Sequence, residues 1–316
     1  MVLKIRWPVL ACAVVACGGD PALGPDAAPT SDADLGVDIV AIPGGCTLDR
    51  SEDDRPDDHG YDQIRVLYVT ASDGSDESHD TNGQICNSIR AVATWFHAQT
   101  GSYLRFDTTG GLLDIGFARL GKTDAAMRGT DPANETIETG IAFVRERIER
   151  ELPALARNKL YAVYYEGTSS YACGGGAYPP VIFGRVGAMY LRAQPPGESV
   201  PCGDSRPWGQ PSLVPSYVDY GILHELVHSL GLVPDASPNE HSSGHVFDVA
   251  AGEPARDLMY SQRPGMPDPF WGVDDPRGLV IDIGNDDYFN APTPGDLATS
   301  SVIAPLSVNA HRPLGW

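Results

Sequence analysis

Two histidines, His224 and His228, stand four residues apart in a segment whose apolar residues follow a helical period. The apolar positions are i, i+3, i+4 and i+7 of one helix face: Leu223, Leu226, Val227 and Leu230. The two imidazoles then lie one turn apart on the neighbouring face, with ~5–6 Å between their Cβ atoms. Ser216 and Asp219 resemble a capping box that starts this helix. The pattern predicts a buried helix that presents two imidazoles side by side.

Glu225 completes the pattern His-Glu-x-x-His. In this pattern two imidazoles bind zinc, and the glutamate between them acts as a general base. Catalytic zinc takes three protein ligands and leaves its fourth position to water. We therefore expect His224 and His228 to be metal ligands and Glu225 to be catalytic. A surface helix with two solvated histidines is the alternative, and the predicted cap and buried face argue against it.

The longer segment resembles the signature of the metzincin clan of zinc metallopeptidases, HExxHxxGxxH/D followed by a Met-turn. His224, Glu225, His228 and Gly231 match this signature. Pro234, however, stands where the clan places its third ligand. Some members of the clan, the leishmanolysins among them, carry an insertion before the third histidine. The resemblance therefore implies a third ligand displaced toward the C-terminus.

The candidates for this third ligand are Asp235, His241, His245 and Asp248. We expect His245, because Gly244 lets the backbone turn tightly before it and the apolar residues at 246 and 247 anchor the chain after it. Asp248 would then suit the role of a partner for an imidazole N–H. His241 and the two aspartates stay open as alternatives.

Met259 and Tyr260 follow fourteen residues after His245 and resemble the Met-turn that underlies the metal site in the clan. Tyr260 is a candidate helper in catalysis, although packing is the interpretation that we favour for it. The resemblance is specific over residues 216–260 and loose over 60–316. It implies a sheet with helices first, then the motif helix, then an irregular lower subdomain.

Upstream of the motif, segments with strand and helix character alternate. The strand-like segments are 64–70, 103–106, 160–165 and 181–191, and the helical ones are 85–96 and 136–152. Alternation of this kind predicts an α/β (α+β) fold with a mixed sheet and long helices in the N-terminal part. After residue 231 the chain is rich in Gly, Pro and Asp, which indicates an irregular C-terminal subdomain. We expect 181–191 to be the edge strand that binds an extended substrate by β-augmentation.

Residues 1–16 are typical of a cleaved export signal, because basic residues precede an apolar stretch too short to cross a bilayer. The four residues that end at Cys17 resemble the lipobox of bacterial lipoproteins, which implies an acylated Cys17 as the only membrane anchor. Gly18 after this cysteine implies the outer membrane or the cell surface. An ordinary cleavable signal with a coincidental cysteine is the alternative. We expect an extended acidic tether over 17–58 and the zinc metallopeptidase domain over 59–316.

Four cysteines remain once the leader and the anchor are set aside. In an exported chain an even number predicts disulfides, and the shortest loops favour Cys46–Cys86 and Cys173–Cys202. The formal charge of −20, from 42 acidic and 22 basic residues, argues against nucleic acid as a partner. We expect a monomer that acts on a polypeptide substrate.

Two acidic stretches are candidate calcium sites, 73–80 and 282–287, because Ca²⁺ takes oxygen ligands. Neither has the spacing of an EF-hand, and solvated loop acids are the interpretation that we favour. The predicted function is a surface-anchored zinc endopeptidase in which the metal acidifies a water molecule and Glu225 takes its proton. A non-catalytic binding lipoprotein that retains the zincin fold is one alternative, motivated by Pro234. A zinc amidase acting on cell-wall material is the other.

Overall fold

The computed structural model describes residues 42–128, 137–153, 155–177, 179, 182–230, 233, 237–241, 244–247, 256–260, 278–291, 296–305, 307, 310 and 312. The predicted leader and the predicted anchor Cys17 lie outside these residues. So do the four motif positions Gly231, Pro234, Asp235 and Asp248. Within the described part of the chain, no helix combines the length and the apolar character needed to cross a membrane.

A five-stranded sheet forms the centre of the fold. Its order in space is β5 (Ile115–Arg119), β1 (Gln63–Thr70), β6 (Lys159–Tyr165), β8 (Val186–Tyr190) and β7 (Gly174–Gly175). The first four strands are parallel, and β7 pairs antiparallel with β8. Both β1 and β6 are buried along their whole length, as expected of parallel strands covered on two faces. The predicted α/β class with a mixed sheet is confirmed.

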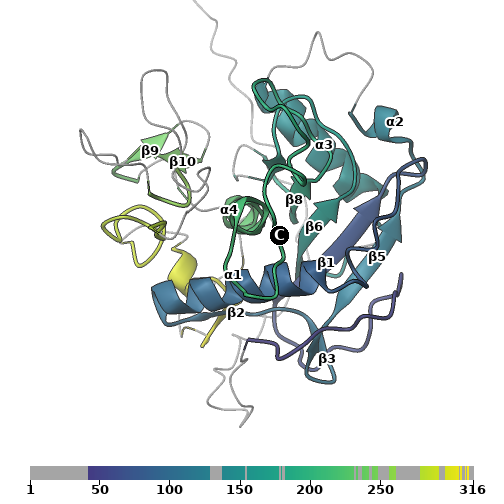
Figure 1. Cartoon of the computed structure of the whole chain (residues 1–316). Helices are drawn as coiled ribbons and strands as arrows, with labels where there is room; N and C mark the ends of the chain where they lie inside the picture. Colours follow the sequence, from purple (N-terminus) through teal and green to yellow (C-terminus); the bar gives the residue numbers. More distant parts are fainter. Residues whose placement is uncertain are drawn as a thin grey trace, which may run out of the picture. The chain divides into compact units, whose positions relative to one another are not determined.

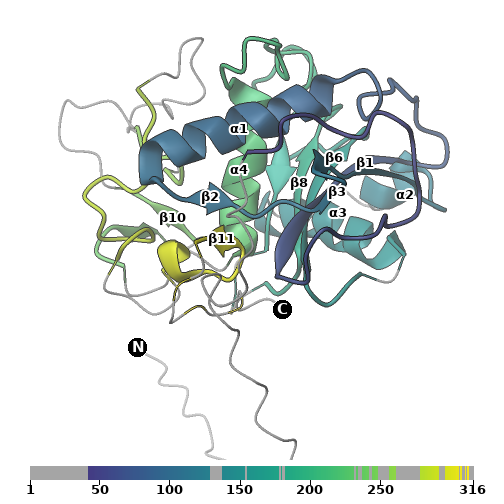
Figure 2. The same cartoon turned by 90° about the horizontal axis from the view of Figure 1, so that it is seen from below.

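The helices are α1 (Gln84–Thr100), α2 (Asp124–Arg128), α3 (Ile137–Glu151) and α4 (Tyr217–Ser229). Both views place the sheet between α1 and α3 (Figures 1 and 2). Helix α4, which carries the His-Glu-x-x-His motif, packs on β8 and contacts α1. Gly221 allows this close packing, because a Cβ at that position would lie only 2.6 Å from the Sδ atom of Met189 in β8.

The prediction that 181–191 forms the edge strand is wrong. The strand in this region, β8, is shorter and lies between β6 and β7, so β7 is the outer strand on that side of the sheet among the described residues. Strand β7 consists of two glycines, Gly174 and Gly175. Glycine is depleted in strands and carries no side chain to produce an alternating pattern, which is why the sequence did not reveal β7.

Short two-stranded ribbons connect the remaining described segments. They are β2 (Tyr103–Leu104) with β11 (Ile303–Ala304), β3 (Thr108–Thr109) with β4 (Leu112–Leu113), and β9 (Glu240–His241) with β10 (His245–Val246). A single 3₁₀ turn, Leu297–Thr299, precedes β11. The part of the C-terminal region that the structure describes is therefore irregular, as predicted, and it returns to the N-terminal half through β11.

Both predicted disulfides, Cys46–Cys86 and Cys173–Cys202, are present. The first ties the chain before residue 59 to the start of α1. Residues 42–58 make further contacts with this part of the fold: the N–H of Phe117 in β5 donates to the carbonyl oxygen of Ser51 at 2.8 Å, and Arg55 pairs with Asp114, the residue before β5. The folded contacts therefore begin N-terminal of residue 59, within the segment for which we expected an extended tether.

A partly buried ion cluster joins residues 42–58 to β6. The Nζ atom of Lys159 lies 2.7 Å from carboxylate oxygens of Asp54, Asp57 and Asp107. Lys159 and Asp107 are both almost fully buried. Burial alone would lower the pKa of Lys159, but the three carboxylates outweigh burial and raise it, so the side chain stays an ammonium.

Candidate metal centre

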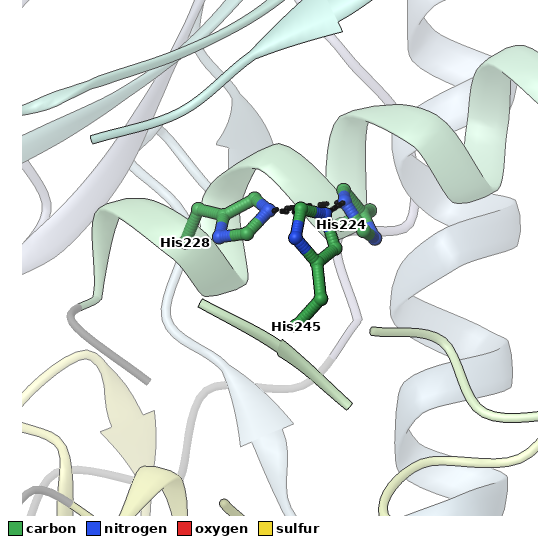
Figure 3. A group of neighbouring side chains, drawn as sticks. All are labelled: His224, His228 and His245. Carbon is green, nitrogen blue, oxygen red and sulfur yellow. Dashed lines mark hydrogen bonds between the residues drawn. The ribbon is translucent and has the colours of Figure 1, made fainter. Parts of the chain in front are cut away.

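Three histidines converge beside the C-terminal half of α4. His224 and His228 come from α4 itself, and His245 comes from β10. The Nε2 atom of His228 lies 3.1 Å from the Nε2 atoms of both other residues, and those two atoms are 3.2 Å apart. Figure 3 shows the three rings pointing their Nε2 atoms at a common centre. The structure thus brings together the three residues that we predicted to be ligands.

Helix α4 positions two of these rings. The carboxylate of Asp219 accepts the backbone N–H of Ser216 at 2.8 Å, so one half of the predicted capping box is formed. The same carboxylate accepts the N–H of Gly209 at 3.1 Å and ties the start of the helix to the preceding loop. His224 and His228 are 5% and 4% exposed. Both rings therefore lie inside the protein, which argues against the interpretation of a solvated surface helix.

The third ring is delivered by a tight turn. Gly244 adopts a φ of 74°, a left-handed conformation that glycine takes without strain. His245 follows directly and begins β10, which pairs with β9 in a register that sets His245 opposite His241. The role that we assigned to Gly244 matches this geometry. The two aspartate alternatives, Asp235 and Asp248, lie outside the described residues.

The turn Asp257–Tyr260 holds the metal centre in place through main-chain hydrogen bonds. The Nδ1 atom of His224 donates a hydrogen bond to the carbonyl oxygen of Leu258 at 2.7 Å. The carbonyl oxygen of Met259 accepts the N–H of Val246, the residue after His245, at 3.0 Å. Met259 is fully buried and Tyr260 is 1% exposed. This turn occupies the place that the predicted Met-turn would take.

The chemistry of the three rings fits a metal ion. Because a carbonyl group can only accept, the proton of His224 is on Nδ1 and the lone pair of Nε2 points into the centre. Burial lowers the pKa of His224 to about 4 and the pKa of His228 well below its ordinary value, so both rings are neutral at pH 7. Metal ligation requires this neutral form.

The distances between the three imidazole nitrogens also fit a zinc ion. Zinc binds imidazole nitrogens at ~2.0–2.1 Å in a tetrahedral arrangement, which sets such nitrogens about 3.3–3.4 Å apart. The distances of 3.1–3.2 Å between the three Nε2 atoms are within a few tenths of an ångström of this value. The set is one of three groups of potential ligands in the described residues and the only one of those three made of nitrogen donors.

Glu225 lies beside this centre on the side of β7. Its Oε1 atom is so close to Gly174 that a Cβ on that glycine would be 2.4 Å away. Two more glycines, Gly176 and Gly187, meet the main chain of Glu225 in the same way, at 2.5 and 2.7 Å. Glu225 as a whole is half-buried, and desolvation of its carboxyl group raises the pKa to about 8.

The glycine contacts are the part of the site that sequence reasoning missed. The run Gly174–Gly176 is visible in the sequence and follows Cys173 directly. Three successive glycines next to a disulfide indicate a place where another part of the chain approaches the backbone closely. This run of glycines can be noticed in the sequence, but no neighbouring residue indicates that α4 is the segment that approaches it.

The acidic stretches considered for calcium use their carboxylates within the protein. Asp76 and Asp80 both pair with Arg50. In the second stretch Asp282, Asp286 and Asp287 lie close together, but Asp282 accepts backbone N–H groups of residues 286–289. The interpretation as solvated acids is wrong for Asp80, Asp282 and Asp287, which are buried and bonded to groups of the protein.

The chain has only a weak structural likeness to known proteins. No protein-family model and no curated protein matches the chain. Among solved structures, the chain is similar to the crystal structure of archaemetzincin from Methanopyrus kandleri, with 14% sequence identity and a TM-score of 0.31. The match covers 63% of this chain and 82% of that chain. At this TM-score the likeness carries no weight for function, which must rest on the histidine centre itself.

Proposed function

We propose that this chain is a zinc-dependent endopeptidase. The observation that carries the proposal is the convergence of three Nε2 atoms within 3.2 Å of one another, with Glu225 on the same helix as two of them. Three imidazoles are donors that suit zinc, and three protein ligands are typical of catalytic rather than structural zinc. When bound, zinc acidifies a water molecule and polarises the carbonyl group of a substrate.

Glu225 supplies the acid–base function in this proposal. Burial raises the pKa of its carboxyl group, which makes the carboxylate a stronger proton acceptor than that of an exposed glutamate. A cation held by the three histidines would favour the ionised form, which is the form that accepts a proton. The glycines around Glu225 hold the α4 backbone close to the sheet and thereby fix where the carboxylate lies.

Strand β7 supplies the binding edge. It pairs with β8 on one side, and among the described residues no strand pairs with its other side. Both glycines of β7 are buried, so an extended peptide would form main-chain hydrogen bonds there by β-augmentation only after the chain that covers the strand is displaced. Because Oε1 of Glu225 contacts Gly174 of this strand, such a peptide would pass next to the proposed base.

Two features support the proposal that the protein is exported and anchored by a lipid. The two disulfides are typical of an exported protein, since the cytosol keeps thiols reduced. The sequence at Cys17 supports a lipid anchor at the bacterial outer membrane or cell surface. Loss of membrane partitioning in Cys17→Ser, with release of the protein to the medium, is the expected result if this cysteine is the anchor.

The function is tested with the purified chain, by elemental analysis for zinc and by hydrolysis of an unfolded protein such as casein. We expect about one zinc per chain, and loss of hydrolysis in Glu225→Gln with the zinc retained. Glu52→Gln, which makes the same change at an exposed position outside the centre, should leave both unchanged. Hydrolysis that survives Glu225→Gln would refute the assigned base. Full zinc occupancy without any peptide hydrolysis would instead favour the binding lipoprotein, or the amidase if cell-wall amides are cleaved.

A further inference from the structure

The topology of the sheet contains a point where chain connections diverge. Along the chain the parallel strands follow as β1, β5, β6 and β8, whereas in space β1 lies between β5 and β6. The connection after β1 therefore runs to one side, and the chain later returns to the other side. In open α/β sheets, ligands bind outside the carboxyl ends of the strands at such a switch point.

A cavity of about 280 Å³ lies at this place. Its wall includes Glu77 and His79 from the loop after β1, Glu166 directly after β6, and Arg192 shortly after β8. The loop between β8 and α4 closes the cavity with Asp204 and Trp208. This loop is held in place by the Cys173–Cys202 disulfide. Neither the three histidines of the metal centre nor Glu225 is part of the wall.

The charges in the cavity do not balance. Glu166 is 3% exposed, and its carboxylate pairs with Arg192 and with the imidazole of His79 at 3.3 Å. The same guanidinium also lies 3.0 Å from Asp204 and 3.5 Å from Glu77. One guanidinium is thus shared by three carboxylates, and the imidazole of His79 lies beside only one of them. Acidic groups therefore outnumber basic groups in the wall of the cavity, and a further cation would offset this excess.

The accessible groups face a ligand that enters from solvent. The side chains of Glu77 and Asp204 are 47% and 53% exposed, so their carboxylates stand at the rim rather than in the core. Trp208 is buried between Tyr164, which stacks on the indole with ring centroids 5.5 Å apart, and His79, whose ring meets it at 5.2 Å, so the indole and the imidazole form the inner wall of the cavity. Carboxylates at the rim of a cavity bind ammonium and guanidinium groups through charge-assisted hydrogen bonds. A cavity of this size holds a ligand no larger than about one amino acid.

We infer that this cavity binds a small organic cation with an ammonium or guanidinium group. The cation is held by Glu77 and Asp204 at the rim, with Glu166 beneath them. Two sources share this chemistry, a free amine and a basic side chain of a polypeptide. The site is separate from the metal centre, so its occupancy does not depend on the proposed peptidase activity.

Calorimetric titration of the full chain with agmatine, which carries both an amine and a guanidinium, tests the inference. We expect saturable binding that weakens at least tenfold in the double variant Glu77→Gln/Asp204→Asn. The matched control Glu52→Gln/Asp53→Asn removes the same two charges at exposed positions outside the cavity and should bind agmatine like the wild type. Equal affinities in the two double variants would overturn the inference, because binding would then reflect only the overall negative charge.

A second pair of titrations identifies the source of the cation. The blocked peptides Ac-Gly-Arg-Gly-NH₂ and Ac-Gly-Gln-Gly-NH₂ differ only in the charged side chain. Tighter binding of the arginine peptide than of agmatine assigns the cavity to a polypeptide side chain, and the reverse order assigns it to a free amine. Absence of binding by agmatine and by the arginine peptide, in a chain whose thermal unfolding is cooperative, would overturn the inference.

Discussion

Replacement of Gly174 by alanine tests whether the glycine of β7 sets the position of the proposed base. A Cβ at this position would lie 2.4 Å from Oε1 of Glu225 and 2.9 Å from the backbone oxygen of Ala188. Real Cβ atoms essentially never come within 3.0 Å of such neighbours. Because Ala188 is in the centre of β8, the new methyl group cannot retreat, and the carboxylate of Glu225 has to move by about 0.6 Å or more.

The expected loss in rate follows from this displacement. A shift of about 1 Å in a catalytic group costs on the order of 100-fold, which corresponds to about 2.7 kcal/mol in the activation free energy. We therefore expect kcat of Gly174→Ala to fall about 10- to 100-fold. Zinc content should stay unchanged, since the nearest atoms to the new methyl group belong to Glu225 and Ala188 and not to a histidine.

Steady-state kinetics with a quenched fluorescent peptide would measure this effect, with zinc content and thermal unfolding measured in parallel. Glu225→Asp shortens the carboxylate by one methylene, so Gly174→Ala should cost less in that background than in the wild type. Gly44→Ala is the matched control, because no atom lies within 4 Å of a Cβ at Gly44. A wild-type kcat in Gly174→Ala, or an equal loss in both backgrounds, would refute the reasoning.

Three further predictions follow from the contacts. Removal of one ligand in His245→Ala should weaken zinc binding by about 100-fold or more in a competition titration, because even the loss of an outer partner costs 10–100-fold. The double variant Cys173→Ser/Cys202→Ser opens a loop of 29 residues and should lose about 3.5 kcal/mol in urea unfolding; a loss below 1 kcal/mol would contradict this. Burial would raise the pKa of Glu166, but His79 and Arg192 outweigh burial and lower it below its ordinary value of 4.5. Its contribution to stability is therefore present above pH 4.5 and is lost as the pH falls below that value, so the stability difference between the wild type and Glu166→Gln should be larger at pH 7 than at pH 3. A difference that does not change between these two pH values would show that the carboxylate is not stabilised in its ionised form.

Local patterns in the sequence predicted the parts of the site that depend on a few neighbouring residues. The period of α4 placed His224 and His228 on one face, and Gly244 indicated the turn before His245. Long-range contacts were not visible in the same way. Gly174 and Gly175 form a strand with no pattern of their own, and their approach to Glu225 depends on how α4 packs on β8.

The acidic segments show that the sequence also fails to reveal the long-range partners of charged residues. Asp54 and Asp57 belong to a composition typical of an extended tether, yet they pair with Lys159, about a hundred residues away in the chain. Asp76 and Asp80 looked like solvated acids or cation ligands until Arg50 was seen to contact both. The number of charges in a segment does not tell which partner each one meets, because ion pairs in a folded chain join residues that are far apart in sequence.

The turn Asp257–Tyr260 holds the metal centre through main-chain carbonyls, Leu258 to His224 and Met259 to the strand of His245. Support of this kind depends on the path of the backbone and on the number of residues in the turn. Apolar side chains at 258 and 259 can therefore change during evolution while the donor set stays the same. Insertion or deletion of one residue would move both carbonyls at once. Among diverging descendants of this protein, we expect the length of this turn to be kept more strictly than its amino acids.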